Sequence, residues 1–350
     1  MLESEKIEKY SEKNDTVKQS MLIVLFLILP VVLFFVSILI GRYAMSVSEV
    51  VEGFLSTIFP NSFHAGNNIQ TVLFQLRIPR ILAAMLVGAA LSISGAAFQG
   101  IFKNPLVSPD ILGVSAGAGF GAALALLISG SPLLVQASAL FFGLSAVAIT
   151  YSISRFFKMN STLNLVLGGI AVSAVFSALI SMVKYIADPN SKLPAITYWL
   201  MGGLSSISLS DLSIVVLPIL ICMAVLYLLR WRLNVLSLGE SEAETLGVDT
   251  KKYQLIIIVC CTLMTAAAVS ISGIVGWAGL VIPHVCRMIV GPNYRRLLPA
   301  TISLGALFML FVDDIARNIA TIELPLGVLT ALVGAPFFIY LLTRNYEGWS

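Results

Sequence analysis

The side chains of this sequence that could do chemistry are few, and several lie at the ends of long apolar runs. Arg77 and Arg80 precede one run, whereas Asp313, Asp314 and Arg317 lie near the end of another. A planar guanidinium can bind a carboxylate through two parallel hydrogen bonds, so grouped arginines suit docking to an acidic partner. Interfacial snorkelling of single arginines explains the same pattern equally well. The residues alone leave both interpretations open.

The aspartates offer a second kind of chemistry. Asp313 precedes Arg317 by four residues, which makes the two side chains neighbours on one helix face, so we expect an ion pair between them. Asp314 projects about 100° away and has no evident partner in the sequence. Ion-coupled carriers usually use ionisable residues inside the bilayer. A secondary carrier that depends on Asp313 or Asp314 is therefore the alternative from a different functional class.

A metal site is suggested at first by the stretch GIVGWAGLVIPHVCR at 273–287, which contains His284 and Cys286. Residues two apart on a helix point about 200° from each other, so these two cannot share one ion. There is no other His, and no Cys close in sequence, to complete a site, and we expect no metal site. The glycines of the stretch instead predict a tight, irregular crossing between two spans. Pro283 falls in the first turns of the second span, where a proline is less costly.

Enzymatic catalysis would have little to use in this chain. There are only two histidines, and the sequence has no HExxH, no GxSxG and no cluster of carboxylates within its apolar runs. It also lacks GxxxxGK followed by Ser or Thr, so it cannot bind ATP through a P-loop of its own. We therefore expect a chain that is not an enzyme and carries no cofactor. Nothing resembles the filter of a channel, although a ring of charges made by assembly would not show in a single chain.

The elements that must position these residues are membrane spans. The chain is 58% hydrophobic and 11% charged, with a mean hydropathy of +0.96, whereas a soluble domain carries about 25% charged residues. Apolar runs of about 20 residues recur along it, which predicts an all-α polytopic membrane protein. We expect ten spans, at 21–40, 81–101, 111–129, 134–153, 164–186, 212–229, 255–272, 278–291, 298–318 and 325–342. The four cysteines all fall within apolar segments and are interpreted as small buried hydrophobes.

Basic residues orient this bundle, because loops on the cytoplasmic side are enriched in Lys and Arg. With the N-terminus inside, most of the 21 basic residues fall inside, and the outer ones are Arg42, Arg77, Arg80, Lys184, Lys192 and Arg317. This split supports an even number of spans with both termini cytoplasmic. We expect residues 1–20 to form a cytoplasmic tail and residues 21–350 to form a single transmembrane domain.

Two connecting segments and one glycine-rich span carry further structural signals. The outer segment SVSEVVEGFLSTIF at 46–59 could form an amphipathic surface helix. The inner loop 230–254 is polar, and Ser241 or Glu240 could cap a short helix there that runs through Leu246 and stops at Gly247. In GVSAGAGFG at 113–121, glycines lie four residues apart, and we interpret them as ordinary close helix packing rather than a dedicated dimer face.

Several stretches resemble a known family, in that family's order. They are LRIPRILAAMLVGAALSISGAAFQGIFKNPLVSPDILGVSAGAGFG (76–121), YWLMGGL (198–204), LSLGESEAETLGV (236–248), GIVGWAGLVIPHVCR (273–287) and ELPLGVLTALVGAPFFIYLL (323–342). The match covers roughly residues 70–345 and is similar to the FecCD-type permeases. These are the membrane subunits of ABC importers for ferric siderophores, haem and cobalamin. The resemblance implies a cobalamin-importer-permease-like bundle of ten spans.

The resemblance also implies partners and sites. Two permease chains would pair, most simply as a homodimer. Two ATPase subunits, which bind the ATP, would attach on the cytoplasmic side. A substrate-binding protein would dock on the extracytoplasmic side. By similarity, the binding protein would dock on Arg77, Arg80 and Arg317. The inner gate would comprise Asn104, Leu106 and Thr162, although Leu163 stands where the family often has a small polar residue. ATPase coupling would use Gly239, Glu240, Ala243, Leu246 and Gly247.

The implied substrate is an iron–siderophore complex, with haem or cobalamin as the alternatives within the same machine. The implied location is the cytoplasmic membrane, crossed several times. Substrate identity depends largely on the binding protein, which is a separate chain.

Overall fold

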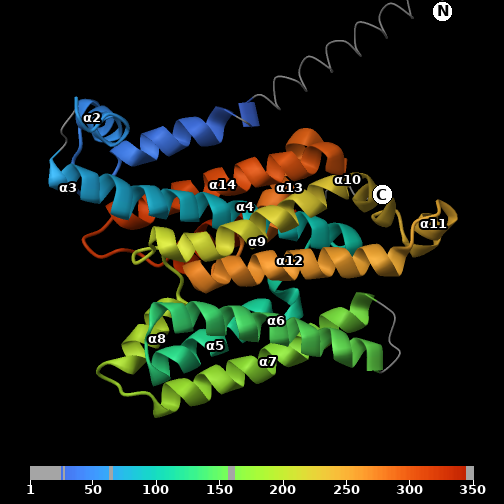
Figure 1. Ribbon diagram of the computed structural model, residues 1–350. Helices are drawn as coiled ribbons and strands as arrows, with labels where there is room; N and C mark the ends of the chain where they lie inside the picture. Colours follow the sequence, from blue (N-terminus) through green and yellow to red (C-terminus); the bar gives the residue numbers. More distant parts are fainter. Residues whose placement is uncertain (1–24, 27, 63–65, 157–161, 344–350) are drawn as a thin grey trace, which may run out of the picture.

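The structure is a computed structural model that describes the chain except for residues 1–24, 27, 63–65, 157–161 and 344–350 (Figure 1). All regular elements within the described residues are helical. An apolar helix at Ile28–Leu39 comes first. It is followed by α2 (Val47–Ile58), α3 (Asn67–Gln70), the π-helix η1 (Thr71–Arg77), α4 (Ile78–Ile101), the 3-10 helix η2 (Pro109–Leu112), α5 (Val114–Ile128), α6 (Pro132–Phe156), α7 (Thr162–Ile186), α8 (Lys192–Leu200), α9 (Leu209–Leu228), α10 (Arg230–Leu236), α11 (Glu240–Thr245), α12 (Thr250–Ser272), α13 (Ala278–Val290), α14 (Tyr294–Asn318) and α15 (Leu326–Thr343).

The predicted spans are confirmed as apolar helices. Within the described residues, six helices are long and apolar enough to cross a membrane, namely Asn67–Ile101, α6, Leu163–Ile186, α9, α12 and α14. The remaining predicted spans correspond to the shorter apolar helices Ile28–Leu39, α5, α13 and α15. The six long helices begin before the predicted limits, Asn67–Ile101 by 14 residues and the others by one to five, whereas α5 and α13 stay within them. The predicted cytoplasmic tail at residues 1–20 lies outside the described part of the chain.

Helix α4 forms the centre of the bundle. It packs against α9, α12, α13 and α14, and most of its residues are buried. Glycines allow two of these contacts to be backbone against backbone. A Cβ at Gly88 would lie 2.1 Å from the carbonyl oxygen of Gly305, and a Cβ at Gly95 would lie 1.7 Å from that of Gly279. Small residues at such crossings are typical of helix packing in membranes.

Replacing Gly95 with alanine should therefore destabilise the protein. The added methyl group would overlap a neighbouring backbone carbonyl, so α4 and α13 would have to separate, at a cost of about 1–3 kcal/mol. Thermal unfolding of the purified protein in detergent measures the effect as a lower Tm. The matched control is Gly203→Ala, since a Cβ at Gly203 meets nothing within 4 Å. Equal Tm values for the two variants would contradict this account of α4.

Helices α5 to α8 gather on one side of the bundle and pack on the rest mainly through α12 (Figure 1). Gly117 and Gly121 face α6, where a Cβ would lie 2.4 Å and 2.2 Å from the carbonyl oxygens of Phe142 and Ser138. The interpretation of these glycines as ordinary packing is confirmed, because a helix of the same chain covers them. Gly113 differs from the prediction. It is the N-cap of α5, with φ +88°, and not a member of the helix face.

The irregular crossing predicted at 273–287 is present. Gly273 ends α12 with φ +65°, residues 274–276 have no regular secondary structure, and Trp277 precedes α13 with φ +69°. A Cβ at Gly273 would lie 2.3 Å from the carbonyl oxygen of Trp199, so only glycine fits. Pro283 lies within α13, one turn and a half after its start. The stretch therefore serves to redirect the chain between two packed helices.

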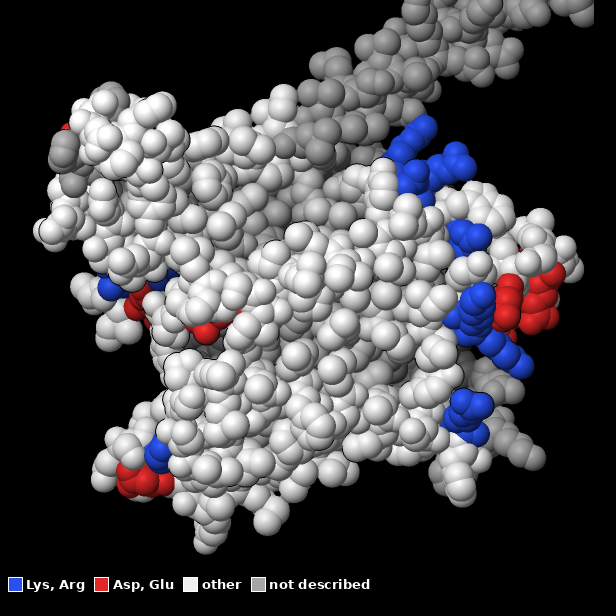
Figure 2. Space-filling model, viewed as in Figure 1, with Lys and Arg blue, Asp and Glu red and all other residues white. Residues whose placement is uncertain are grey.

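Charged side chains lie at the two ends of the bundle, with an uncharged band between them on the face shown in Figure 2. The predicted amphipathic helix is α2, and its capping box between Ser46 and Glu49 is complete. The 24 residues of α4 span about 36 Å at 1.5 Å per residue, which exceeds the roughly 30 Å of a bilayer's hydrocarbon core. The two ends of α4 therefore define two separate candidate sites.

Candidate functional site

The first site lies at the N-terminal end of α4 and centres on arginines. Arg77 ends the π-helix η1, two residues before Pro79, which cannot donate the hydrogen bond that a regular helix needs there. Arg77 is 5% exposed, and its guanidinium donates hydrogen bonds to the backbone carbonyls of Ile38 and Tyr43. These acceptors are neutral. The charge of Arg77 is therefore solvated by backbone dipoles, and no ion pair to it is formed among the described residues.

Arg80, one turn further along α4, is instead bound by carboxylates. Its Nε lies 3.0 Å from both carboxylate oxygens of Asp313, and its Nη2 lies 2.9 Å from Oδ1 of the same residue. Its Nη1 donates to both oxygens of Glu323 at 2.9 Å. The Asp313 side chain is fully buried, whereas that of Glu323 is 26% exposed. One guanidinium thus joins α4, α14 and the segment that leads into α15.

Arg317 has a different principal partner from the one predicted. Its Nε lies 3.7 Å from Asp313, which makes the predicted pair a loose one. Its Nη2 forms the tighter ion pair with Asp314 and also donates to the hydroxyl of Ser37. The Ser37 hydroxyl donates to Asp314 at 2.7 Å. The expectation that Asp314 has no partner was therefore wrong, because its partners are three residues away on α14 and on the first helix.

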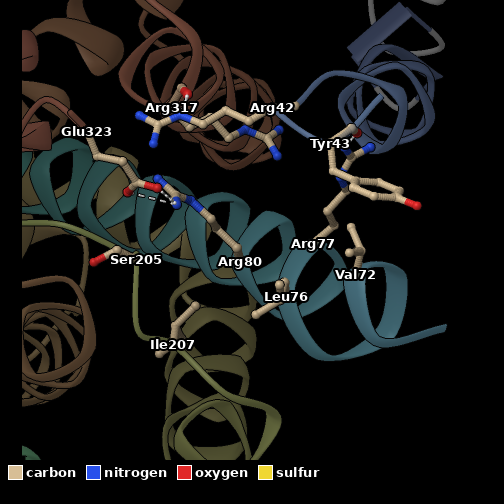
Figure 3. Close-up of a pocket in the computed structure, with 11 residues that line it drawn as sticks. Arg42, Tyr43, Val72, Leu76, Arg77, Arg80, Ser205, Ile207, Arg317 and Glu323 are labelled. Atoms are coloured by element: carbon tan, nitrogen blue, oxygen red, sulfur yellow. Dashed lines mark hydrogen bonds and ion pairs between the residues drawn. The ribbon is translucent and has the colours of Figure 1, made fainter. Parts of the chain in front are cut away.

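The side chains of Arg77, Arg80, Arg317 and Glu323 line a pocket of about 250 Å³ (Figure 3). Arg80 reaches toward Glu323, with Arg317 and Arg42 beside them and Arg77 next to Tyr43. Sequence reasoning missed Arg42, which donates to the carbonyls of Arg317 and Ala320 at 3.0 Å each. It also missed Glu323, although the position of this acid at the start of ELPLG was a usable signal. We call this group of Arg42, Arg77, Arg80, Arg317 and Glu323 the arginine pocket.

A second cavity, of about 530 Å³, opens at the same end of the bundle. Its lining is uncharged and comprises Leu200, Met201, Ile274, Gly276, Trp277, Gly327, Val328, Ala331 and Leu332. Backbone hydrogen bonds connect its walls, since Leu326 and Gly327 donate to Gly202 and Met201 at 3.0 Å. The GIVGWAG stretch thus forms one wall of an apolar cavity beside the arginine pocket.

The other end of α4 carries the residues predicted as a gate. We call residues 103–107 the gate turn. The Asn104 side chain accepts a hydrogen bond from the backbone N–H of Leu106 at 2.9 Å, which closes the turn, and Leu106 is 52% exposed. Thr162 begins α7 at the same end of the bundle, and its side chain lies outside the described part of the structure (Figure 1).

A polar cluster that sequence reasoning missed supports the gate turn from inside. Gln99 is fully buried, and its amide nitrogen donates to the carbonyls of Val107 and Leu280 at 3.3 Å each. Its amide oxygen accepts a hydrogen bond from Arg287. Gln99 therefore fastens the gate turn to α13. A glutamine inside an otherwise apolar run was the signal, since a buried amide requires partners.

The predicted coupling segment also lies at this end, where α11 projects past the neighbouring helices (Figure 1). The helix runs from Glu240 to Thr245, and Ala243 is its buried residue. The prediction of Ser241 or Glu240 as its cap was wrong, because the N-cap is Gly239, with no side-chain cap. Its predicted stop is confirmed. Gly247 follows with φ +74° and donates to the carbonyl of Glu244 at 3.0 Å.

Comparison with known proteins now identifies the chain. The model of the FecCD transport family matches residues 27–344. The chain belongs to the FecCD transport family. The molybdate import system permease MolB of Haemophilus influenzae is 42% identical over 313 residues, which covers 89% of this chain and 92% of that protein. A Helicobacter pylori protein named as an iron chelatin transport system permease is 38% identical, over 90% of this chain and 96% of its own length. The hemin transport system permease HmuU of Yersinia pestis is 35% identical, over 89% and 95%.

Solved structures agree with this FecCD assignment. A structure described as a metal-chelate type ABC transporter in an inward-facing conformation is 41% identical and superposes with a TM-score of 0.82, covering 93% of this chain and 99% of that one. A chain of PsaBC from Streptococcus pneumoniae, at 17% identity and a TM-score of 0.55, shares the fold. The FecCD chain is thus a multi-pass ABC importer permease, and ATP hydrolysis belongs to a partner. An ion-coupled carrier built on Asp313 or Asp314 is not supported.

Proposed function

We propose that this chain is the permease subunit of an importer for an iron–siderophore complex. The observation that carries the proposal is its 41% identity to a metal-chelate type transporter over 93% of the chain. The relative named for iron chelatin transport, at 38% identity, supports the same substrate class. An uncharged cavity beside the arginine pocket is consistent with a path that binds its cargo weakly, so that release is not stalled.

Molybdate is the second candidate, because the permease named for it is 42% identical over 89% of this chain. Haem and cobalamin stay as alternatives, given the relatives named for them. The test is ATP-driven uptake by proteoliposomes that contain the permease, its ATPase and its binding protein. Uptake of iron-labelled ferric siderophore supports the proposal, whereas uptake of labelled molybdate, haem or cobalamin in its place overturns it.

We propose that the end of the bundle with α11 faces the cytoplasm and that both termini lie there, in the cytoplasmic membrane. The basic residues at that end support this, since Lys103, Arg230, Arg232, Lys251, Lys252, Arg295 and Arg296 gather near α11 and the start of α14. The arginine pocket would then face the substrate-binding protein. Two copies of the chain would pair as a homodimer above two ATPase subunits, which bind the ATP.

The arginine pocket is proposed as the docking site, with Arg77, Arg80 and Arg317 receiving acidic side chains of the binding protein. Arg77 suits this role best, because its present acceptors are neutral carbonyls. A carboxylate would add a full negative charge and the planar two-oxygen geometry that a guanidinium binds, whereas the carbonyls offer only dipoles. The transport cycle would then run in four steps. The binding protein docks, the ATPase dimer closes, α11 moves, and the gate at Asn104, Leu106 and Thr162 opens.

The variant Arg77→Gln is expected to weaken binding of the partner binding protein about tenfold, which corresponds to roughly 1.4 kcal/mol. Glutamine keeps hydrogen-bond donors for the carbonyls but removes the positive charge. Surface plasmon resonance with the immobilised permease–ATPase complex measures the affinity. The complex itself should purify unchanged, and Lys192→Met provides the control at a half-buried lysine of the same end. Unchanged affinity in Arg77→Gln would remove this residue from the docking site.

A further inference from the structure

One side chain connects the gate turn to the coupling segment. Lys103 follows α4 and holds its backbone at φ +47°, a left-handed conformation that is unusual for a residue with a side chain. From there its ammonium nitrogen donates to the backbone carbonyl of Leu238 at 2.7 Å. Leu238 directly precedes Gly239, the N-cap of α11. Residues that lie 135 positions apart are thus joined by one hydrogen bond.

Gly239 leaves the space in which this contact forms. A Cβ at Gly239 would lie 2.4 Å from Nζ of Lys103 and 2.2 Å from Oε2 of Glu242. The ammonium and the carboxylate therefore converge on the glycine. The pKa of Glu242 is lowered by its own backbone N–H, by the Ser241 hydroxyl and, more weakly, by the Lys103 ammonium. A side chain at position 239 would push both groups away.

The contact leads directly into the gate. Lys103 is the first residue of the gate turn, and the N–H of the next residue, Asn104, donates to the carbonyl of Gln99 at 3.2 Å. Gln99 in turn holds the far end of the turn through Val107. The other side-chain hydrogen bonds of α11 lead to α12 and not to the gate turn. Gln254 of α12 donates to Glu240 at 3.2 Å, and Thr250 of α12 donates to Glu244 at 3.4 Å.

We propose that Lys103 is a positioning residue that fastens α11 to the gate turn, so that a displacement of α11 by the ATPase is passed to the gate directly. This inference rests on the proposed role of α11 in coupling. Lys103 is exposed, and an exposed hydrogen bond of this kind contributes only about 1 kcal/mol to stability. Its loss therefore leaves the fold intact while it disconnects two elements that must move together.

The test compares Lys103→Met with Lys103→Arg in proteoliposomes that contain the full transporter. Methionine keeps an unbranched stem and removes the ammonium, whereas arginine keeps a donor that can reach the Leu238 carbonyl. We expect Lys103→Met to hydrolyse ATP at the wild-type rate but to take up about threefold to tenfold less substrate per ATP. Lys103→Arg should restore most of the wild-type uptake per ATP hydrolysed. Lys251→Met is the control at an exposed lysine of the same end.

Two results would overturn the proposal: a wild-type uptake-to-ATP ratio in Lys103→Met, or an equal loss in Lys251→Met. Failure of the coupling role itself has a different signature. In that case, Gly239→Val would also keep the wild-type ratio, and α11 would not be the coupling element. If Gly239→Val uncouples the transporter while Lys103→Met does not, coupling through α11 stands and only the role of Lys103 is wrong.

Discussion

Replacing Arg80 with methionine is expected to lower the free energy of unfolding by about 3–5 kcal/mol, as is typical when one partner of a buried ion pair is removed. Asp313 would keep a fully buried negative charge, with only Arg317 at 3.7 Å to compensate it. The link between α4 and the segment at Glu323 would be lost as well. Thermal and denaturant unfolding in detergent measure the loss, and we expect reduced yields of folded protein in the membrane.

The double variant Arg80→Met with Asp313→Asn separates the cost of the unpaired Asp313 charge from the cost of the lost Arg80 packing. It should recover a large part of the stability, because the uncompensated carboxylate is gone. Arg42→Met is the matched control. Arg42 is exposed and donates to carbonyls, so we expect less than about 1 kcal/mol from its loss. A neutral effect of Arg80→Met would mean that the buried pair with Asp313 does not stabilise the protein.

Replacing Gly239 with valine is expected to reduce uptake per ATP by about 100-fold while hydrolysis continues. The backbone there has φ +146°, which a β-branched residue rarely adopts, and the strain costs about 1–3 kcal/mol. The added side chain would also displace Lys103 and Glu242. Helix α11 would then begin in a different direction and would no longer fit the surface that moves it. Parallel measurements of ATP hydrolysis and substrate uptake give the ratio.

Thr245→Ala is the control for the valine variant. Thr245 is exposed on the same helix, and its hydroxyl donates only within α11, to the carbonyl of Glu242 at 2.8 Å. We expect its uptake-to-ATP ratio to match the wild type. A wild-type ratio in Gly239→Val would show that α11 is not the coupling element.

Local patterns predicted most of the fold. Apolar runs located the spans, because each helix must satisfy its own backbone in the bilayer and so shows as a continuous hydrophobic segment. The amphipathic pattern at 46–59, which forms α2, and the stop at Gly247 are likewise local signals. The N-cap of α11 was missed, because a residue with an accepting side chain was expected and the chain uses Gly239 instead.

The pairings within the sites were less predictable. Arg80 and Asp313 are separated by 233 residues, and the choice of Asp313 over Asp314 depends on how α4 and α14 are rotated against each other. Helical spacing could suggest a pair between Asp313 and Arg317, but it could not show that Ser37 brings Asp314 to Arg317. The contact of Lys103 with Leu238 was also hidden, because its acceptor is a backbone carbonyl, which every residue carries.

The arginine pocket has a consequence for the lifetime of a docked complex. Each guanidinium in it already holds oxygen acceptors of this chain, so an arriving carboxylate must compete with them. The free energy gained is then the difference between two sets of hydrogen bonds, and a small difference corresponds to fast dissociation. We expect a partner that leaves after each delivery. An importer that must be reloaded for every molecule benefits from a short residence time.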